Sequence, residues 1–325
     1  MGKDFRPGIQ FETGAEVTAV LITHADCLRH DPGPGHPERP ERLSTLIDHL
    51  HGSGLIRHLD QCEAPEATRE QLCRVHDPDY VARIFATAPD HGERIWLDAD
   101  TSMSEYSLGA ALRSAGAAVE AVDRVLNGRH KTAFCAVRPP GHHAGRSSAM
   151  GFCIFNNVAV GAAHALVHHG IARVAIVDFD VHHGNGTEEI FTDEERVLLC
   201  SSFQHPFYPY SGAHTFSDHL ISIPLPAGTS GEMFRCRLTE SGLPRLKAFQ
   251  PQLIFLSAGF DAHKDDPLGG LCWNESDYAW VTEQIMAVAD RACHGRVVSV
   301  LEGGYAPAAL GRSVVAHLTA LTGLR

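Results

Sequence analysis

The chain has 325 residues, 44% hydrophobic and 20% charged, which is enough apolar material for one large α/β domain or two ordinary ones. Its formal net charge of −12 argues against a nucleic-acid-binding protein, because such proteins usually carry a basic face. The odd number of cysteines, nine, excludes complete disulfide pairing, so we expect reduced thiols and a cytoplasmic protein. No 18-residue apolar run and no secretory signal are visible, which predicts neither a membrane span nor export.

Strand-like and helix-like patterns alternate along the chain. An apolar strand is predicted over residues 17–23, and an amphipathic helix follows Pro40, with Leu43 and Leu50 on one face. Further helices are predicted over residues 77–85, 104–126, 157–168, 233–249, 276–293 and 307–321. Further strands are predicted over residues 132–137, 173–177, 197–201, 220–224, 253–257 and 296–301. This alternation indicates a mostly parallel sheet flanked by helices on both faces, and the absence of any linker or repeat favours a single domain over residues 1–325.

The segments richest in His, Asp and Gly each follow a predicted strand. They cover residues 138–151, 178–186, 259–270 and 302–305. In open α/β sheets the ligand crevice lies beyond the carboxyl ends of the strands. We therefore expect four loops to bring reactive side chains to one edge of the sheet.

The segment 178–186 predicts a metal site. Asp180 and His182 are two residues apart on an extended backbone, so their side chains point the same way. Asp261 follows another predicted strand and is the natural third ligand, although taken alone it would more often cap a turn. Two carboxylates and one imidazole leave a position open, as catalytic zinc requires, and iron suits the same ligands.

Adjacent imidazoles at His142 and His143 lie in a loop stiffened by proline and glycine. Histidine can serve as base and acid near neutral pH, and each ring needs a partner for its second nitrogen. Asp178 and Asn185 are the candidates for His142 and His143 respectively. Tyr305, after two glycines, is a candidate oxyanion donor, although a tyrosine there is also ordinary turn structure.

Other histidines and aromatic residues have less specific interpretations. The pair at residues 168–169 is expected on the surface. Aromatic residues at Phe152 and at positions 207–208 would form either the walls of a narrow slot for an alkyl chain or simple core packing, and the sequence does not separate the two.

Taken together and in this order, these segments resemble the zinc-dependent histone deacetylase superfamily, in particular its class II-like bacterial deacetylases and acetylpolyamine amidohydrolases. The resemblance is strongest over residues 17–322 and rests on residues 36–40, 75–76, 138–144, 151–157, 178–187, 259–261 and 302–305. It implies a single-domain, arginase/deacetylase-like α/β fold.

The resemblance also implies roles for individual residues. Asp180, His182 and Asp261 would hold zinc. His143 would be the general base and acid, with His142 as its electrostatic partner. The remaining catalytic residues would be Tyr305 as oxyanion donor and Asp178 and Asn185 as supports of the two imidazoles.

Substrate and potassium positions follow from the same resemblance. The Gly151 carbonyl would accept from the substrate amide, Phe152 and Tyr208 would wall the tunnel, and Leu268 would be the gatekeeper. Asp98 is a candidate rim contact. A potassium ion is expected near five residues, largely through backbone oxygens: Asp178, Asp180, His182, Ser201 and Ser202.

Three positions refine the resemblance. Asn185 stands where class I members have Asp and class II-like members have Asn, and this neutral partner should favour a base at neutral pH. Tyr208 stands where many relatives have Phe. Arginase-type binuclear hydrolases need a further Asp where this chain has Gly184, which argues for one catalytic metal.

The resulting hypothesis is a zinc-dependent amidohydrolase that removes acetyl or short acyl groups from amines, above all from N-ε-acyl-lysine-type substrates. One alternative is an acetylpolyamine amidohydrolase. A second is a non-catalytic, zinc-containing binding or regulatory protein. The expected partner is an acylated amine, without nucleic acid or membrane, and the sequence leaves a homo-oligomer open.

Overall fold

A computed structural model of the chain describes residues 19–215 and 217–324. One eight-stranded sheet runs through it in the order β2-β1-β5-β10-β9-β6-β7-β8, and every neighbouring pair is parallel. The strands are β1 (Ala19–Thr23), β2 (Asp60–Glu63), β5 (Thr132–Cys135), β6 (Val174–Asp178), β7 (Val197–Gln204), β8 (Leu220–Leu225), β9 (Leu253–Ala258) and β10 (Val297–Leu301). The predicted parallel α/β architecture is confirmed, while residues 17 and 18 of the first predicted strand lie outside the described residues.

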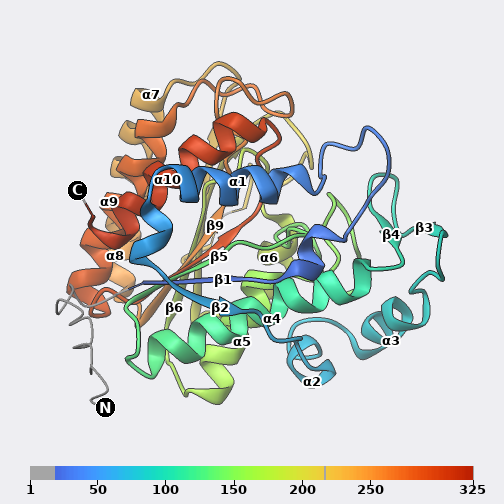
Figure 1. The fold of residues 1–325 in the computed structure, drawn as a ribbon. Helices are drawn as coiled ribbons and strands as arrows, with labels where there is room; N and C mark the ends of the chain where they lie inside the picture. Colours follow the sequence, from blue (N-terminus) through green and yellow to red (C-terminus); the bar gives the residue numbers. More distant parts are fainter. Residues whose placement is uncertain (1–18, 216, 325) are drawn as a thin grey trace, which may run out of the picture.

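Helices cover both faces of the sheet. The longer ones are α1 (Glu41–Gly52), α3 (Pro78–Ala86), α4 (Ser107–Leu126), α5 (Asn157–His168), α9 (Glu275–Ala292) and α10 (Pro307–Thr322). Figure 1 shows α1, α9 and α10 together on one face, and α4 and α5 side by side on the other. Shorter helices are α2 (Arg69–Leu72), α6 (Asn185–Phe191), α7 (Gly231–Arg237) and α8 (Leu243–Phe249). Among the described residues no helix is long and apolar enough to cross a bilayer.

Strands β5, β10, β9 and β6 are consecutive neighbours in the middle of the sheet. Their carboxyl ends are nearly level, since Asp178 pairs with Ser257 and Leu301 pairs with Ala258. The chain passes from β5 to β6 across two strands that it adds later, which creates a switch in strand order. The four loops rich in His, Asp and Gly follow these four strands, so the expectation that they meet at one edge is confirmed.

Two predicted helices differ from the structure. The predicted helix over residues 233–249 is divided into α7 and α8 by a π-helical segment, η3 (Leu238–Gly242). Pro244, in the first turn of α8, has no N–H to continue the preceding hydrogen-bond pattern, which accounts for the division. The helix predicted from residue 104 begins instead at residue 107, because Ser104 belongs to a short strand, β4 (Ser102–Ser104), paired with β3 (Arg94–Trp96).

Helix α4 offers a test of how tightly this face is packed. A Cβ at Gly116 would overlap the backbone at Pro65 and Ala67, whereas a Cβ at Gly109 would meet nothing within 4 Å. We expect Gly116→Ala to destabilise the fold by about 1–3 kcal/mol through overpacking. Gly109→Ala, in the same helix, should stabilise it by up to about 1 kcal/mol, because alanine is the better helix former. Urea unfolding of both variants measures the difference, and stabilisation by both would contradict the packing at residue 116.

Candidate active site

Three buried side chains converge beyond strands β6 and β9. His182 Nδ1 lies 3.0 Å from Asp180 Oδ1 and 3.3 Å from Asp261 Oδ2, and one ligand atom from each residue lies within 4.8 Å of the others. Backbone groups hold the two carboxylates: Val181 N donates to Asp261 Oδ1 and Gly303 N donates to Asp180 Oδ2, both over 2.8 Å. Asp261 Oδ2 is buried and accepts no hydrogen bond. The three side chains expected to hold a metal thus share one small space.

The electrostatics of this cluster fit a divalent cation. Burial and the charge of Asp180 raise the pKa of Asp261 to about 7. Burial disfavours a charged ring at His182, yet its contacts with Asp180 and Asp261 raise the pKa of His182 to about 10. Both pKa shifts reflect excess negative charge at a site shielded from water. Two carboxylate oxygens and one imidazole nitrogen, with one oxygen unpaired, are a donor set that Zn²⁺ accepts.

Glycines beside the cluster leave no room for a side chain, as two of them show. A Cβ at Gly303 would overlap Oδ2 of both Asp180 and Asp261. A Cβ at Gly184 would overlap Asp178 Oδ2. The position where a binuclear hydrolase needs another aspartate is therefore closed by Asp178, which agrees with a single metal.

The two adjacent histidines have different partners. His142 Nδ1 lies 2.9 Å from Asp178 Oδ2, whereas His143 Nδ1 lies 2.7 Å from Asn185 Oδ1. Although burial opposes it, the charges of Asp180 and Asp178 raise the pKa of His142 well above its usual range. Burial and the neighbouring His142 charge lower the pKa of His143 well below it. The pairing expected from the sequence is present, and it separates a cationic imidazole from a neutral one.

A buried carboxylate fixes the loop that carries these histidines. Glu302 Oε2 accepts hydrogen bonds from Gly141 N over 2.7 Å and from His142 N over 3.1 Å. Burial raises the pKa of Glu302 to about 7. Because Glu302 directly follows β10, the neighbour of β5, the carboxylate joins the histidine loop to the turn that precedes Tyr305.

Two residues that the sequence did not single out hold the Tyr305 turn. Arg42 Nε donates a hydrogen bond of 2.6 Å to Gly304 O, and Arg42 Nη2 donates one of 2.5 Å to Glu302 O. The Arg42 guanidinium lies 4.7 Å from the centroid of the Tyr305 ring. Asp266 Oδ2 accepts a hydrogen bond of 2.6 Å from Tyr305 N. The turn is therefore fixed on one side by a cation and on the other by a carboxylate.

Arg42 is itself held by a buried ion-pair network. Glu38 Oε1 accepts from Arg42 Nη1 over 3.0 Å, and Glu38 Oε2 accepts from Arg138 Nη2 over 2.6 Å. His30 Nε2 lies 3.3 Å from the same carboxylate. All four side chains are almost completely buried. Since losing one partner would leave a buried charge uncompensated, this network keeps Arg42 in one position.

A narrow cavity of about 290 Å³ leads to this cluster. Phe152 forms one wall, with its ring 5.7 Å from that of Tyr305 at an angle of 80°. On the other side the ring of Phe207 stacks on His182 at 5.5 Å, and the Tyr208 ring meets His143 at 5.3 Å. The lining consists of Asp100, His143, Gly151, Phe152, His182, Phe207, Tyr208, Pro267, Leu268 and Tyr305. The aromatic residues therefore line a slot rather than only filling the core.

The cavity contains four of the five expected substrate contacts. Gly151, Phe152, Tyr208 and Leu268 line it. Asp98 does not, and lines a separate hollow with Tyr80 and Arg83. Asp100, two residues further on, lies in the slot instead, and its Oδ1 accepts from Gly151 N over 3.0 Å. The carboxylate at the slot is thus Asp100, which sequence reasoning missed because nothing in the Asp98-Ala99-Asp100 sequence distinguishes the two.

The residues expected around potassium lie close together. Asp178 pairs with Ser201 across β6 and β7, and Ser202 Oγ donates to the Asp178 carbonyl over 3.4 Å. His183 turns away from the cavity, with Nδ1 3.1 Å from Ser201 Oγ and Nε2 3.1 Å from Glu188 Oε2. His183 therefore contacts Ser201 and Glu188 and does not line the slot.

Comparison with known proteins agrees with this geometry. The family model described as "Histone deacetylase domain" matches residues 36–321. The chain is 37% identical to a histone deacetylase-like amidohydrolase of Pseudomonas aeruginosa, over 92% of this chain and 84% of that protein. It is 36% identical to type-2 histone deacetylase 2 of Dictyostelium discoideum, over 99% of this chain, but spans only 22% of that longer protein.

A solved structure shares the fold as well. The crystal structure of the HDA15 HD domain superposes with a TM-score of 0.89 at 33% identity, and the match covers 94% of this chain and 90% of that one. The chain therefore belongs to the histone deacetylase family of deacetylases and amidohydrolases.

Proposed function

We propose that the whole chain is one catalytic domain, a zinc-dependent amidohydrolase that removes acetyl or short acyl groups from N-ε-acyl-lysine-type amines. The observation that carries this proposal is the position of His143, which is hydrogen-bonded to Asn185 and lines the slot beside the cluster of Asp180, His182 and Asp261. A zinc ion held by these three residues would polarise the amide carbonyl and lower the pKa of a water molecule. The proposal also includes a potassium ion near Asp178 and Ser201. It includes a cytoplasmic setting as well, with which the nine cysteines agree, because all of them lie in the described residues and form no disulfide.

Proton transfer falls to His143. Because its Nδ1–H donates to Asn185 Oδ1, the other ring nitrogen is left as an acceptor. The lowered pKa keeps this nitrogen unprotonated at neutral pH, so it can take the proton of the attacking water. The resulting imidazolium then protonates the leaving amine. His142, held by Asp178, contributes positive charge beside the developing negative charge.

Tyr305 supplies the oxyanion donor. Burial and the charges of Asp261 and Asp180 raise the pKa of Tyr305 well above its usual range. The hydroxyl therefore keeps its proton and can donate a hydrogen bond. Arg42 and Asp266 prevent the turn from shifting when charge develops. Preorganised donors of this kind lower the activation barrier without any rearrangement of the site.

Removal of the Tyr305 hydroxyl tests this role. Tyr305→Phe keeps the ring against Phe152 and Arg42, and should lower kcat by about a hundred- to a thousand-fold, as loss of one oxyanion donor typically does. Bound zinc and the melting temperature should not change. Tyr210→Phe is the matched control, because Tyr210 is 77% exposed and does not line the slot. Near-normal turnover in Tyr305→Phe would contradict the proposed donor.

Gly303→Ala tests the metal ligands. The new methyl group would displace the inner oxygens of Asp180 and Asp261, so we expect zinc affinity to fall by roughly ten- to a hundred-fold or more. Zinc per chain, measured after dialysis against a chelator, should be one equivalent lower than in the wild type, while circular dichroism shows a folded chain. Gly52→Ala, whose Cβ meets nothing within 4 Å, is the control. Undiminished zinc in Gly303→Ala would exclude this ligand set.

The acetylpolyamine alternative is favoured by one observation, the carboxylate of Asp100 in the slot lining. A free ammonium group on the substrate would gain from that charge, whereas the amide backbone of a lysine peptide would need only a hydrogen-bond acceptor. The two functional hypotheses therefore differ in whether substrate binding needs the negative charge of Asp100.

Paired kinetics separate the substrates. We expect a higher kcat/KM for an acetyl-lysine peptide than for acetylputrescine, and the peptide activity should survive Asp100→Asn, which keeps an acceptor for Gly151 N. A preference for acetylputrescine that is lost in Asp100→Asn would establish the polyamine alternative. Stoichiometric zinc without turnover of acyl-lysine peptides, acylpolyamines or small amides would favour the non-catalytic alternative.

A further inference from the structure

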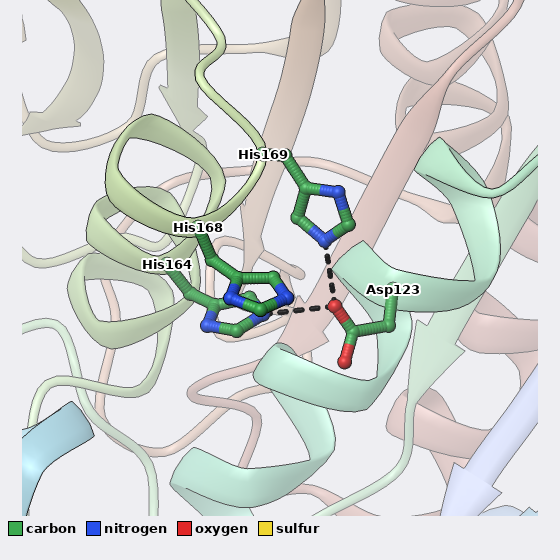
Figure 2. A group of neighbouring side chains, drawn as sticks. All are labelled: Asp123, His164, His168 and His169. Carbon is green, nitrogen blue, oxygen red and sulfur yellow. Dashed lines mark hydrogen bonds and ion pairs between the residues drawn. The ribbon is translucent and has the colours of Figure 1, made fainter.

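A second group of side chains with potential metal-ligand atoms lies at the far end of α5 from the histidine loop. Asp123 comes from the last turns of α4, His164 and His168 lie one turn apart on α5, and His169 directly follows that helix. Figure 2 shows the three imidazoles gathered around the Asp123 carboxylate. The 12 residues of α5 span about 18 Å, so this group is distinct from the catalytic cluster.

The contacts within the group are close. Asp123 Oδ1 lies 2.8 Å from His164 Nε2 and 2.7 Å from His169 Nε2. The rings of His164 and His168 stack with centroids 4.8 Å apart. One potential ligand atom from each of the four residues lies within 4.8 Å of all the others. Among the described residues, this is the one such group besides Asp180, His182 and Asp261.

We infer that Asp123, His164, His168 and His169 bind a divalent transition-metal ion such as Zn²⁺, which ties α4 to the end of α5. Imidazole nitrogens with one carboxylate oxygen suit zinc and its neighbours rather than calcium or magnesium, which prefer oxygen ligands alone. Burial lowers the pKa of His164, which keeps the ring in the neutral form that a metal requires.

The helices themselves favour a cation at this place. The group lies at the carboxyl ends of both α4 (Ser107–Leu126) and α5 (Asn157–His168), where the unpaired carbonyls carry partial negative charge. The carboxylate adds a full charge, since hydrogen bonds from His169 and His164 outweigh burial and keep the pKa of Asp123 below its usual range.

The carboxylate and two of the imidazoles need to move only slightly to bind an ion. Ligand atoms around tetrahedral zinc, with bonds of about 2.0 Å, lie about 3.3 Å apart. Asp123 and the His164 and His169 nitrogens, now at hydrogen-bond distance, would have to separate by roughly 0.5 Å. His168 is exposed, its ring stacks on that of His164, and a ligand atom already within 4.8 Å of the others would have to move closer.

One neighbouring cation opposes binding. Arg74 Nη1 donates to His164 Nδ1 over 2.9 Å, so the ring proton of His164 must lie on Nε2. A metal at Nε2 would move that proton to Nδ1, where it would face Arg74. The guanidinium must therefore swing out toward Glu70, which Arg74 Nη2 already contacts at 3.0 Å and whose side chain is 83% exposed. Arg74 thus weakens the site without blocking it.

Calorimetric titration with Zn²⁺ tests the inference, starting from protein that carries its catalytic zinc. The wild type should bind one further equivalent and gain thermal stability, because the ion binds only the folded chain. The double variant His168→Ala/His169→Ala should lose that equivalent, with affinity lowered by about a hundred-fold or more. His91→Ala is the matched control, because His91 is also paired with a carboxylate, Glu105 at 2.6 Å, but is 90% exposed and outside the group.

Arg74→Gln gives a change in the opposite direction. The glutamine carbonyl can accept from Nδ1–H of a metal-bound His164, so zinc should bind about ten-fold more tightly, the size of effect typical for a partner of a ligand histidine. Zinc affinity that is unchanged or weaker in this variant would overturn the role of His164. A further equivalent that survives in the double variant, or none in the wild type, would overturn the site, and neither result would bear on the catalytic zinc.

Discussion

The structure depends on placing several carboxylates in a dry space at the carboxyl edge of a parallel sheet. Asp178, Asp180, Asp261 and Glu302 are all at most 1% exposed. Backbone N–H groups partly satisfy them, and His142 brings one positive charge, but the raised pKa values of Asp261 and Glu302, both about 7, reflect negative charge that remains. A bound divalent cation would remove this imbalance. The same charge that makes the edge costly to fold would make it selective for a metal.

The neighbouring Glu38 network solves the same physical problem without a metal. Its carboxylate is buried as deeply as Asp261, but two arginines contact it and hold the pKa of Glu38 well below its usual range against the effect of burial. Arg42 then uses its remaining donors on the backbone of the Tyr305 turn. The Glu38 network therefore supplies its own cations and positions the site, whereas the cluster of Asp180, His182 and Asp261 remains open to a ligand.

The sequence predicted those features that follow from local pattern. Strand–helix alternation predicted the sheet, α5 was predicted with its observed bounds, and loops after central strands predicted which side chains would meet. The supporting contacts were not predictable in this way, because Arg42 and Glu302 are 260 residues apart. A local signal did exist: Arg42 lies four residues before Leu46 and so shares the apolar face of α1. Helix α6 was missed, since its first residue, Asn185, was assigned to a loop.

The contrast between the two metal-binding groups follows from what each group already contacts. In the catalytic cluster one carboxylate oxygen of Asp261 has no partner, so a cation there replaces no existing hydrogen bond at that atom. At the end of α5, Asp123 already accepts hydrogen bonds from the imidazoles of His164 and His169. Arg74 already donates a hydrogen bond to Nδ1 of His164. An ion there must displace these contacts and compete with water, since Asp123 and His168 are accessible. Similar residue types thus imply tight binding where burial leaves an atom unpaired, and weaker, exchangeable binding where the protein already supplies the partners.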